Sequence, residues 1–132
     1  MSQGEAIPYE EAYKVAESFI WWLKPYTEQV EIAGSLRRLK KYVHDIEIVA
    51  QGIPESESFN FNLDIDIPAG NISRPSTQHG MATLLRSGVI NTNRPRNDNR
   101  KNPFGPRYYR INYIYNNREY PVDFFVALPP AD

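Results

Sequence analysis

Cysteine is absent from this chain of 132 residues, and the only histidines are His44 and His79. Without thiols the protein forms no disulfide bond and no thiolate metal site, which fits a reducing compartment. Two imidazoles are too few for a structural zinc site, which takes four cysteine or histidine ligands. Any metal is therefore expected to have oxygen ligands, which favours magnesium or manganese.

Long apolar runs are also absent. The N-terminal segment MSQGEAIPYEEAY has neither the basic start nor the apolar centre of a signal peptide, and no run is long enough to cross a membrane. We therefore expect an intracellular, cytoplasmic protein with no membrane partner. The length, with 41% hydrophobic and 13% aromatic residues, predicts one folded domain over residues 1–132.

The net charge of −1 conceals segments of opposite sign. Residues 45–66 contain six acids and no base, whereas residues 86–110 contain seven bases and one acid. An acidic centre beside a basic segment suits a metal-assisted reaction on a phosphate-rich substrate. Solvated faces of opposite charge would give the same totals.

Periodic apolar residues predict two main helices, over residues 8–26 and 77–87, with Gly88 ending the second. A shorter helix is expected from Ser35 to Lys40 or Lys41, with Ser35 as its cap. These helices would flank a small mixed sheet, so the expected fold class is α/β (α+β).

Alternating apolar residues predict the strands of that sheet. Asn116-Asn117 suits the two-residue turn of a hairpin between the last two strands. Residues 61–67 allow at most a short edge strand, and we interpret Asp64 and Asp66 there as its polar face. The four main strands are expected at residues 28–33, 43–50, 107–115 and 118–127.

Three carboxylates stand out within these strands. Asp45 and Glu47 are two residues apart, so both would leave the same face of a strand about 7 Å apart. Asp123 lies in another apolar strand that could pair beside the first. Three converging carboxylates repel one another unless cations separate them, and two magnesium ions about 4 Å apart would do so. Taken singly, each acid could instead be a solvated surface residue.

A small-residue turn precedes the first two acids. Gly34 lets the backbone approach a ligand closely, and Ser35 adds a hydroxyl at the start of a helix whose free N–H groups suit phosphate. Of Arg37 and Arg38, one is expected to reach that site. The turn alone could be a plain helix cap, so its interpretation depends on its spacing to Asp45 and Glu47.

That spacing resembles a known family. Gly34-Ser35, nine residues and then Asp45-Ile46-Glu47 look like the signature of the nucleotidyltransferase superfamily, which includes DNA polymerase beta. GSLRRLKKYVHDIEIVA is especially similar to the catalytic palm of family X DNA polymerases, and YPVDFFVA resembles the segment with their third carboxylate. FGPRYYRINY resembles standalone members from phages and mobile elements. The similarity covers roughly residues 10–50 and 104–130.

The resemblance implies a palm domain and a reaction. A hydroxyl would attack the α-phosphate of a nucleoside triphosphate and release pyrophosphate. Asp45, Glu47 and Asp123 would be catalytic and would ligate two Mg²⁺ ions, with Mn²⁺ as a substitute, and Asp123 would also accept the proton of the attacking hydroxyl. The phosphates of the nucleotide would be bound by Gly34, Ser35 and Arg38.

The sequence departs from the polymerase pattern at several points. Glu47 stands where the polymerases have aspartate, and Pro121 stands where a polymerase arginine helps to activate the third acid. Relatives also continue past the position of Asp132 into a thumb region, and they carry helix-hairpin-helix segments. A minimal enzyme, a fragment, or a partner chain that supplies the thumb would each explain this end.

The acceptor of the nucleotide is expected to be a DNA end or another nucleic-acid 3′ end. The rings of Tyr108, Tyr109 and Tyr113 could stack on bases, although packing within the hairpin is the explanation that we favour for them. Transfer to a small molecule or a protein hydroxyl, and a noncatalytic nucleotide-binding or regulatory module, are the alternatives. Contacts with the nucleic-acid backbone are expected from Arg94, Arg96, Arg100, Lys101 and Arg107.

Overall fold

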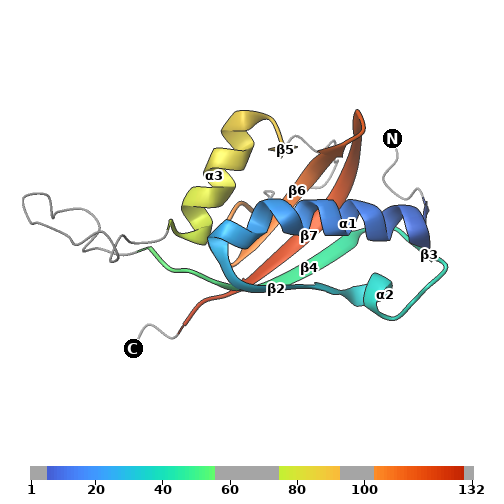
Figure 1. The fold of residues 1–132 in the computed structure, drawn as a ribbon, viewed down its shortest axis with the longest axis horizontal. Coiled ribbons are helices and arrows are strands. Elements are labelled where there is room, and N and C mark those ends of the chain that lie inside the picture. Colours follow the sequence, from blue (N-terminus) through green and yellow to red (C-terminus); the bar gives the residue numbers. More distant parts are fainter. Residues whose placement is uncertain (1–5, 56–74, 93–102, 130–132) are drawn as a thin grey trace, which may run out of the picture.

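A computed structural model describes residues 6–55, 75–92 and 103–129. These residues form a mixed α/β structure with three α-helices, a five-stranded sheet and a two-stranded sheet (Figure 1). The expected α/β class is confirmed at this level. In chain order the elements are β1 (Ile7–Pro8), α1 (Tyr9–Leu23), the 3₁₀ helix η1 (Lys24–Tyr26), β2 (Thr27–Ala33), α2 (Gly34–Arg37), β3 (Tyr42–Val43), β4 (Ile46–Gly52), α3 (Thr77–Ser87), β5 (Ile90–Asn91), β6 (Tyr108–Tyr115) and β7 (Arg118–Ala127).

The five-stranded sheet has the order β2-β4-β7-β6-β5. The central pair, β4 and β7, is parallel, and the other neighbours are antiparallel. In the central pair, Glu47 lies opposite Asp123. The sequence placed these two acids in separate strands that could pair, and the sheet makes the strands neighbours.

Helix α1 covers one face of this sheet, as its apolar stripe predicted. It begins after Pro8, whose extended backbone (φ −60°, ψ 147°) is not helical, and it gives way to η1, which contains Pro25 near its start. The stripe is buried against the sheet, at Ala12, Val15, Ala16, Phe19 and Leu23. The helix predicted over residues 8–26 is therefore confirmed as α1 followed by η1, except that Pro8 belongs to β1.

Residues of the local sequence also determine the turn of the β6–β7 hairpin and the two ends of α3. Asn116 and Asn117 have φ values of 51° and 65°, as a two-residue turn between β6 and β7 requires. The Ser76 hydroxyl accepts a hydrogen bond from the backbone N–H of His79 at the start of α3. Gly88 ends the helix in the left-handed region, at φ 83°.

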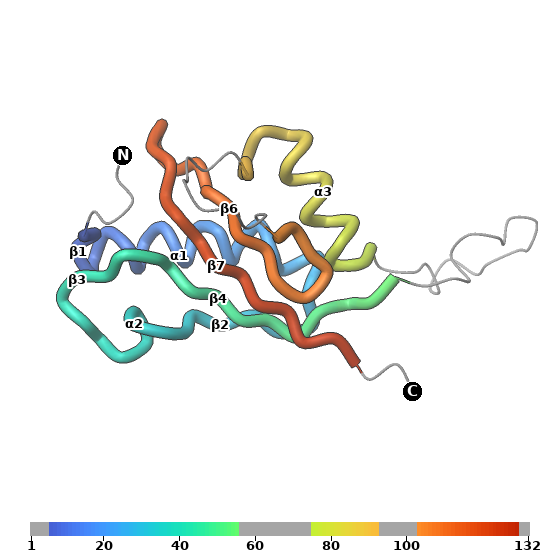
Figure 2. The backbone as a smooth tube through the Cα atoms, turned by 180° about the vertical axis from the view of Figure 1, so that it is seen from behind, coloured from blue at the N-terminus to red at the C-terminus, as the bar shows by residue number. Residues whose placement is uncertain are grey.

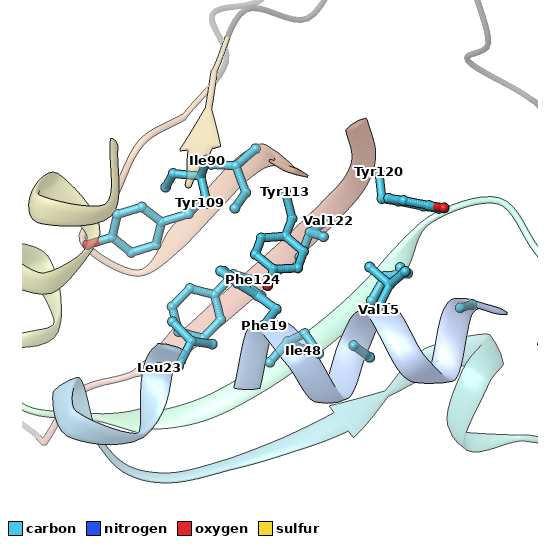
Figure 3. Packing of buried hydrophobic residues seen from close by; sticks show 14 of the residues in the cluster. Val15, Phe19, Leu23, Ile48, Ile90, Tyr109, Tyr113, Tyr120, Val122 and Phe124 are labelled. Atoms are coloured by element: carbon cyan, nitrogen blue, oxygen red, sulfur yellow. The ribbon is translucent and has the colours of Figure 1, made fainter. Parts of the chain in front are cut away.

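The hydrophobic core lies between α1, α3 and one face of the sheet (Figure 3). Phe19 of α1 is fully buried, and its ring contacts Tyr113 at 4.9 Å and Phe124 at 6.1 Å between centroids. Each such side chain contributes about 2 kcal/mol when it leaves water. Because this packing uses one face of the sheet, the opposite face is free of helices within the part of the chain that the structure describes.

Two predicted boundaries are wrong. The strand expected over residues 43–50 begins at Ile46 and ends at Gly52, because Val43 pairs instead with Ile7 in the two-stranded sheet. The short helix ends at Arg37, and Ser35 lies inside it without a capping bond. The short strand considered over residues 61–67 lies outside the described residues. Among those described, no helix has the length and apolar character needed to cross a membrane.

Candidate active site on the open face of the sheet

The face that α1 leaves uncovered carries the predicted acids; we call it the open face. Seen from behind, β4 and β7 run uncovered across α1 (Figure 2). Side chains alternate along a strand, so buried Ile46 and Ile48 face the core while Glu47 faces away from it. In β7, Asp123 lies between the buried Val122 and Phe124 and points the same way as Glu47.

One line of residues crosses four strands on the open face. Ala33 lies opposite Glu47, Glu47 opposite Asp123, and Asp123 opposite Arg110. We call these four positions the carboxylate row. It puts two acids on adjacent strands, between the turn that follows β2 on one side and an arginine of β6 on the other.

Glu47 is in contact with the Gly34 turn. Gly34 has a φ of +66°, and a Cβ added there would lie 1.7 Å from Glu47 Oε1. The space beside the carboxylate therefore exists because residue 34 has no side chain. The predicted link between the Gly-Ser turn and the acids is thus a direct packing contact.

Ser35 and Arg38 lie together on the same turn. Arg38 Nη2 donates a hydrogen bond of 3.5 Å to Ser35 Oγ, and the backbone N–H of Arg38 bonds to the carbonyl of Gly34 at 3.1 Å. Arg37 points elsewhere, toward a hollow of about 640 Å³ between α1 and β2. Of the two arginines, Arg38 is therefore the one whose side chain contacts the Gly34-Ser35 turn.

Asp123 is engaged by two residues of β6. The Tyr108 hydroxyl donates a hydrogen bond of 2.8 Å to Asp123 Oδ1, and Arg110 Nη1 lies 3.6 Å from the same oxygen. Arg110 also donates to the Tyr108 hydroxyl at 3.3 Å. Because Asp123 is 8% exposed, these contacts compensate much of the cost of keeping a carboxylate there.

These contacts shift the pKa values of both partners. The pKa of the Tyr108 phenol is raised, first by burial and then by its hydrogen bond to Asp123. Burial works against the charged form of Arg110, but the hydrogen bond to Tyr108 and the charges of Asp123 and Asp45 outweigh it and raise its pKa. Asp45 therefore acts electrostatically on the same group as Asp123.

Asp45 itself lies in the bend before β4, half-buried. Among the described residues, no three His, Cys, Asp or Glu side chains are gathered closely enough to hold a metal ion. The structure puts Glu47 opposite Asp123 and leaves Asp45 outside the strand, so the prediction that Asp45 and Glu47 leave the same strand face is wrong. These carboxylates have the hard oxygen donors that Mg²⁺ takes, so the residue types fit that ion.

The residues predicted to contact nucleic acid are only partly described. Arg94, Arg96, Arg100 and Lys101 lie outside the described residues, and Arg107 is exposed immediately before β6.

Of the three tyrosines suggested for base stacking, two are in the core: Tyr109 is fully buried and Tyr113 is 2% exposed. For these two the packing explanation is confirmed and base stacking is wrong, because the alternation of β6 turns both rings toward α1 and α3. Only Tyr108 lies on the open face.

Sequence reasoning missed two residues of this face. Phe125 is 41% exposed and stacks on Tyr108, and Arg110 pairs with Asp123. Both could have been found by counting: Phe125 is two residues after Asp123 on one strand, and the Asn116-Asn117 turn sets Arg110 opposite Asp123.

Comparison of the chain with protein-family models and with curated protein sequences gave no match. The function must therefore be inferred from the geometry of the open face.

Proposed function

We propose that this protein is a magnesium-dependent nucleotidyltransferase with a palm-type fold. The observation that supports this best is the carboxylate row: Glu47 and Asp123 lie opposite each other on parallel central strands, and Gly34 packs against Glu47. The paired acids would bind the metal ions of a metal-bound triphosphate. The turn beside them, with its serine and arginine, would bind the phosphates.

Each residue has a role in this proposal. Glu47 and Asp123 would hold the magnesium ions, joined by Asp45 once its side chain turns toward them from the bend before β4. The bound ions would stabilise the charge on the phosphates. Ser35 and Arg38 would bind the phosphates beyond Glu47, because they lie on the turn that packs against that acid. Asp123 would take the proton of the attacking hydroxyl, since it is the acid on the side away from the turn.

The proposed reaction exchanges one bond at the α-phosphorus for another and moves one proton. The hydroxyl oxygen forms a bond to the α-phosphorus, and the bond from that phosphorus to the bridging oxygen breaks. Pyrophosphate leaves toward Ser35 and Arg38, and the hydroxyl proton passes to Asp123. We propose a nucleic-acid 3′ end as the acceptor, supported by Arg110 beside Tyr108 on the open face and by the exposed Arg107 immediately before β6.

A second candidate is a noncatalytic nucleotide-binding module. The observation in its favour is that Arg110 lies 3.6 Å from Asp123 and already supplies the positive charge that a metal would supply. Such a protein would bind the triphosphate at the Gly34 turn without transferring it.

The test is incubation with α-labelled nucleoside triphosphates and Mg²⁺, with single-stranded DNA and cell protein as separate acceptors. Label in DNA is expected from the unaltered protein. It should fall at least about 100-fold in Asp123→Asn and in Glu47→Gln, since each removes a charge from the metal site. Glu31→Gln is the control, because Glu31 is on the same face of β2, opposite Val49. Binding of triphosphate without transfer to any acceptor would establish the noncatalytic candidate instead.

A further inference from the structure

Two aromatic rings lie on the open face next to the carboxylate row. Tyr108 of β6 and Phe125 of β7 are paired in register, with nearly parallel rings (10°) and centroids 4.8 Å apart. Phe125 is 41% exposed, and Val49, its neighbour on β4, is 37% exposed. An apolar strip one side chain wide therefore crosses three strands in water, where an unliganded sheet face would ordinarily carry polar residues.

The strip is adjacent to the proposed reaction centre. Phe125 follows Asp123 by two residues, a distance of about 7 Å along the strand. Tyr108 is connected to the centre directly, because its hydroxyl donates to Asp123 Oδ1 at 2.8 Å. A ligand on these rings would thus lie next to the acid assigned to the attacking hydroxyl.

The direction of the reaction assigns this side to the acceptor. The attacking and leaving oxygens lie roughly in line through the phosphorus in phosphoryl transfer. Ser35 and Arg38 lie on the turn that follows β2 and packs against Glu47, so pyrophosphate would leave toward the Ala33–Glu47 end of the carboxylate row. The acceptor must then approach from the opposite end, over β7 and β6, where Phe125, Tyr108 and Arg110 lie.

We infer that the Tyr108–Phe125 pair is the platform on which the terminal base of a nucleic-acid acceptor stacks. This rests on the proposed function and specifies its acceptor. Exposed rings bind bases by stacking in a sequence-tolerant way, and nearby cations contact the phosphates of the strand. Arg110 supplies such a cation beside the rings, because its guanidinium donates to the Tyr108 hydroxyl. A base stacked on Phe125 would lie two residues along β7 from Asp123.

Binding of a short 5′-labelled thymidine oligonucleotide, followed by fluorescence anisotropy, tests the platform. Phe125→Leu keeps an apolar side chain on the strand but removes the ring, and it should weaken binding about 10-fold. The same oligonucleotide with an abasic 3′-terminal residue should bind the unaltered protein about 10-fold more weakly. The abasic oligonucleotide should bind Phe125→Leu no more weakly than it binds the unaltered protein. The reason is that the substitution and the abasic end each remove the same ring–base contact.

Trp21→Leu is the control, since Trp21 is 67% exposed on α1 and away from the open face. Equal losses in Trp21→Leu and Phe125→Leu, or additive losses from Phe125→Leu and the abasic end, would overturn the platform. Titration of the unaltered protein and of Phe125→Leu with a fluorescent triphosphate and Mg²⁺ separates the platform from the proposed function. Absence of triphosphate binding in the unaltered protein would overturn the proposed function. Intact triphosphate binding without the abasic coupling would overturn the platform alone.

Discussion

Gly34 lies directly against the Glu47 carboxylate, since a Cβ on residue 34 would come within 1.7 Å of Glu47 Oε1. The backbone there has a φ of +66°, in the left-handed region that favours glycine. Two requirements thus meet at one position: a conformation that other residues adopt at a cost, and space for a neighbouring acid. Gly88 meets only the first, because it has a φ of 83° and a Cβ added there would have nothing within 4 Å.

Substitution of the two glycines separates the cost of the left-handed backbone from the effect of the contact with Glu47. Gly34→Ala and Gly88→Ala should each lower the free energy of unfolding by about 1–2 kcal/mol, the cost of a left-handed alanine. Only Gly34→Ala should also displace Glu47 and reduce Mg²⁺-dependent triphosphate binding, by at least about 10-fold. Urea unfolding and a triphosphate titration measure the two effects. Equal triphosphate binding in both variants would mean that Glu47 does not depend on the space beside Gly34.

Arg110 is expected to compete with a metal ion for Asp123. Its Nη1 lies 3.6 Å from Asp123 Oδ1, and a partly exposed ion pair of this kind contributes about 1 kcal/mol. Arg110→Met should therefore tighten Mn²⁺ binding roughly five-fold, as measured by electron paramagnetic resonance of free Mn²⁺. Arg118→Met is the matched control, because Arg118 pairs with Glu11 at 2.9 Å away from the carboxylate row. Weaker Mn²⁺ binding in Arg110→Met would instead make Arg110 a residue that positions Asp123.

The predictions that held depend on neighbours in the sequence. Gly88 could be recognised as the end of α3, and Asn116-Asn117 as a hairpin turn, because each requires a backbone conformation that those residue types favour. The turn also fixes which residues of β6 and β7 face each other, so the Arg110–Asp123 pair was accessible from sequence. The burial of Tyr109 was accessible too, from its alternation with Ile111.

Contacts between distant segments could not be deduced in the same way. The start of β4 at Ile46 depends on Val43 pairing with Ile7, which no local pattern in either segment reveals. The register that puts Glu47 opposite Asp123 joins two residues that are more than half of the chain apart in the sequence. A shift of one residue would have turned one of the two acids toward the core, so this pairing decides whether a site exists.

Tyr120 should make stability depend on pH in the alkaline range. Burial, with its hydrogen bond to Glu11, raises the pKa of Tyr120 to about 12 from the ordinary value of 10.0. The folded protein thus keeps a proton that the unfolded chain loses, so stability is full below pH 10 and falls as pH rises toward 12. Tyr120→Phe should flatten this fall in urea unfolding from pH 9 to 11. At pH 8 it should lower the free energy of unfolding by about 1 kcal/mol, since the bond to Glu11 is lost.

Removal of the Tyr109 hydroxyl should have the opposite effect on stability at pH 8. Burial raises its pKa to about 12 as well, but among the described residues its hydroxyl has no hydrogen-bond partner. A buried polar group without a partner costs about 1 kcal/mol or more, so Tyr109→Phe should raise the free energy of unfolding at pH 8 by about 1 kcal/mol. The ring contacts with Phe104 (4.9 Å) and Phe124 (5.7 Å) do not involve the hydroxyl and would be kept. Like Tyr120→Phe, this change should flatten the alkaline fall in stability. A loss of stability at pH 8 would instead show that the hydroxyl is hydrogen-bonded in the folded protein, for example to a buried water molecule.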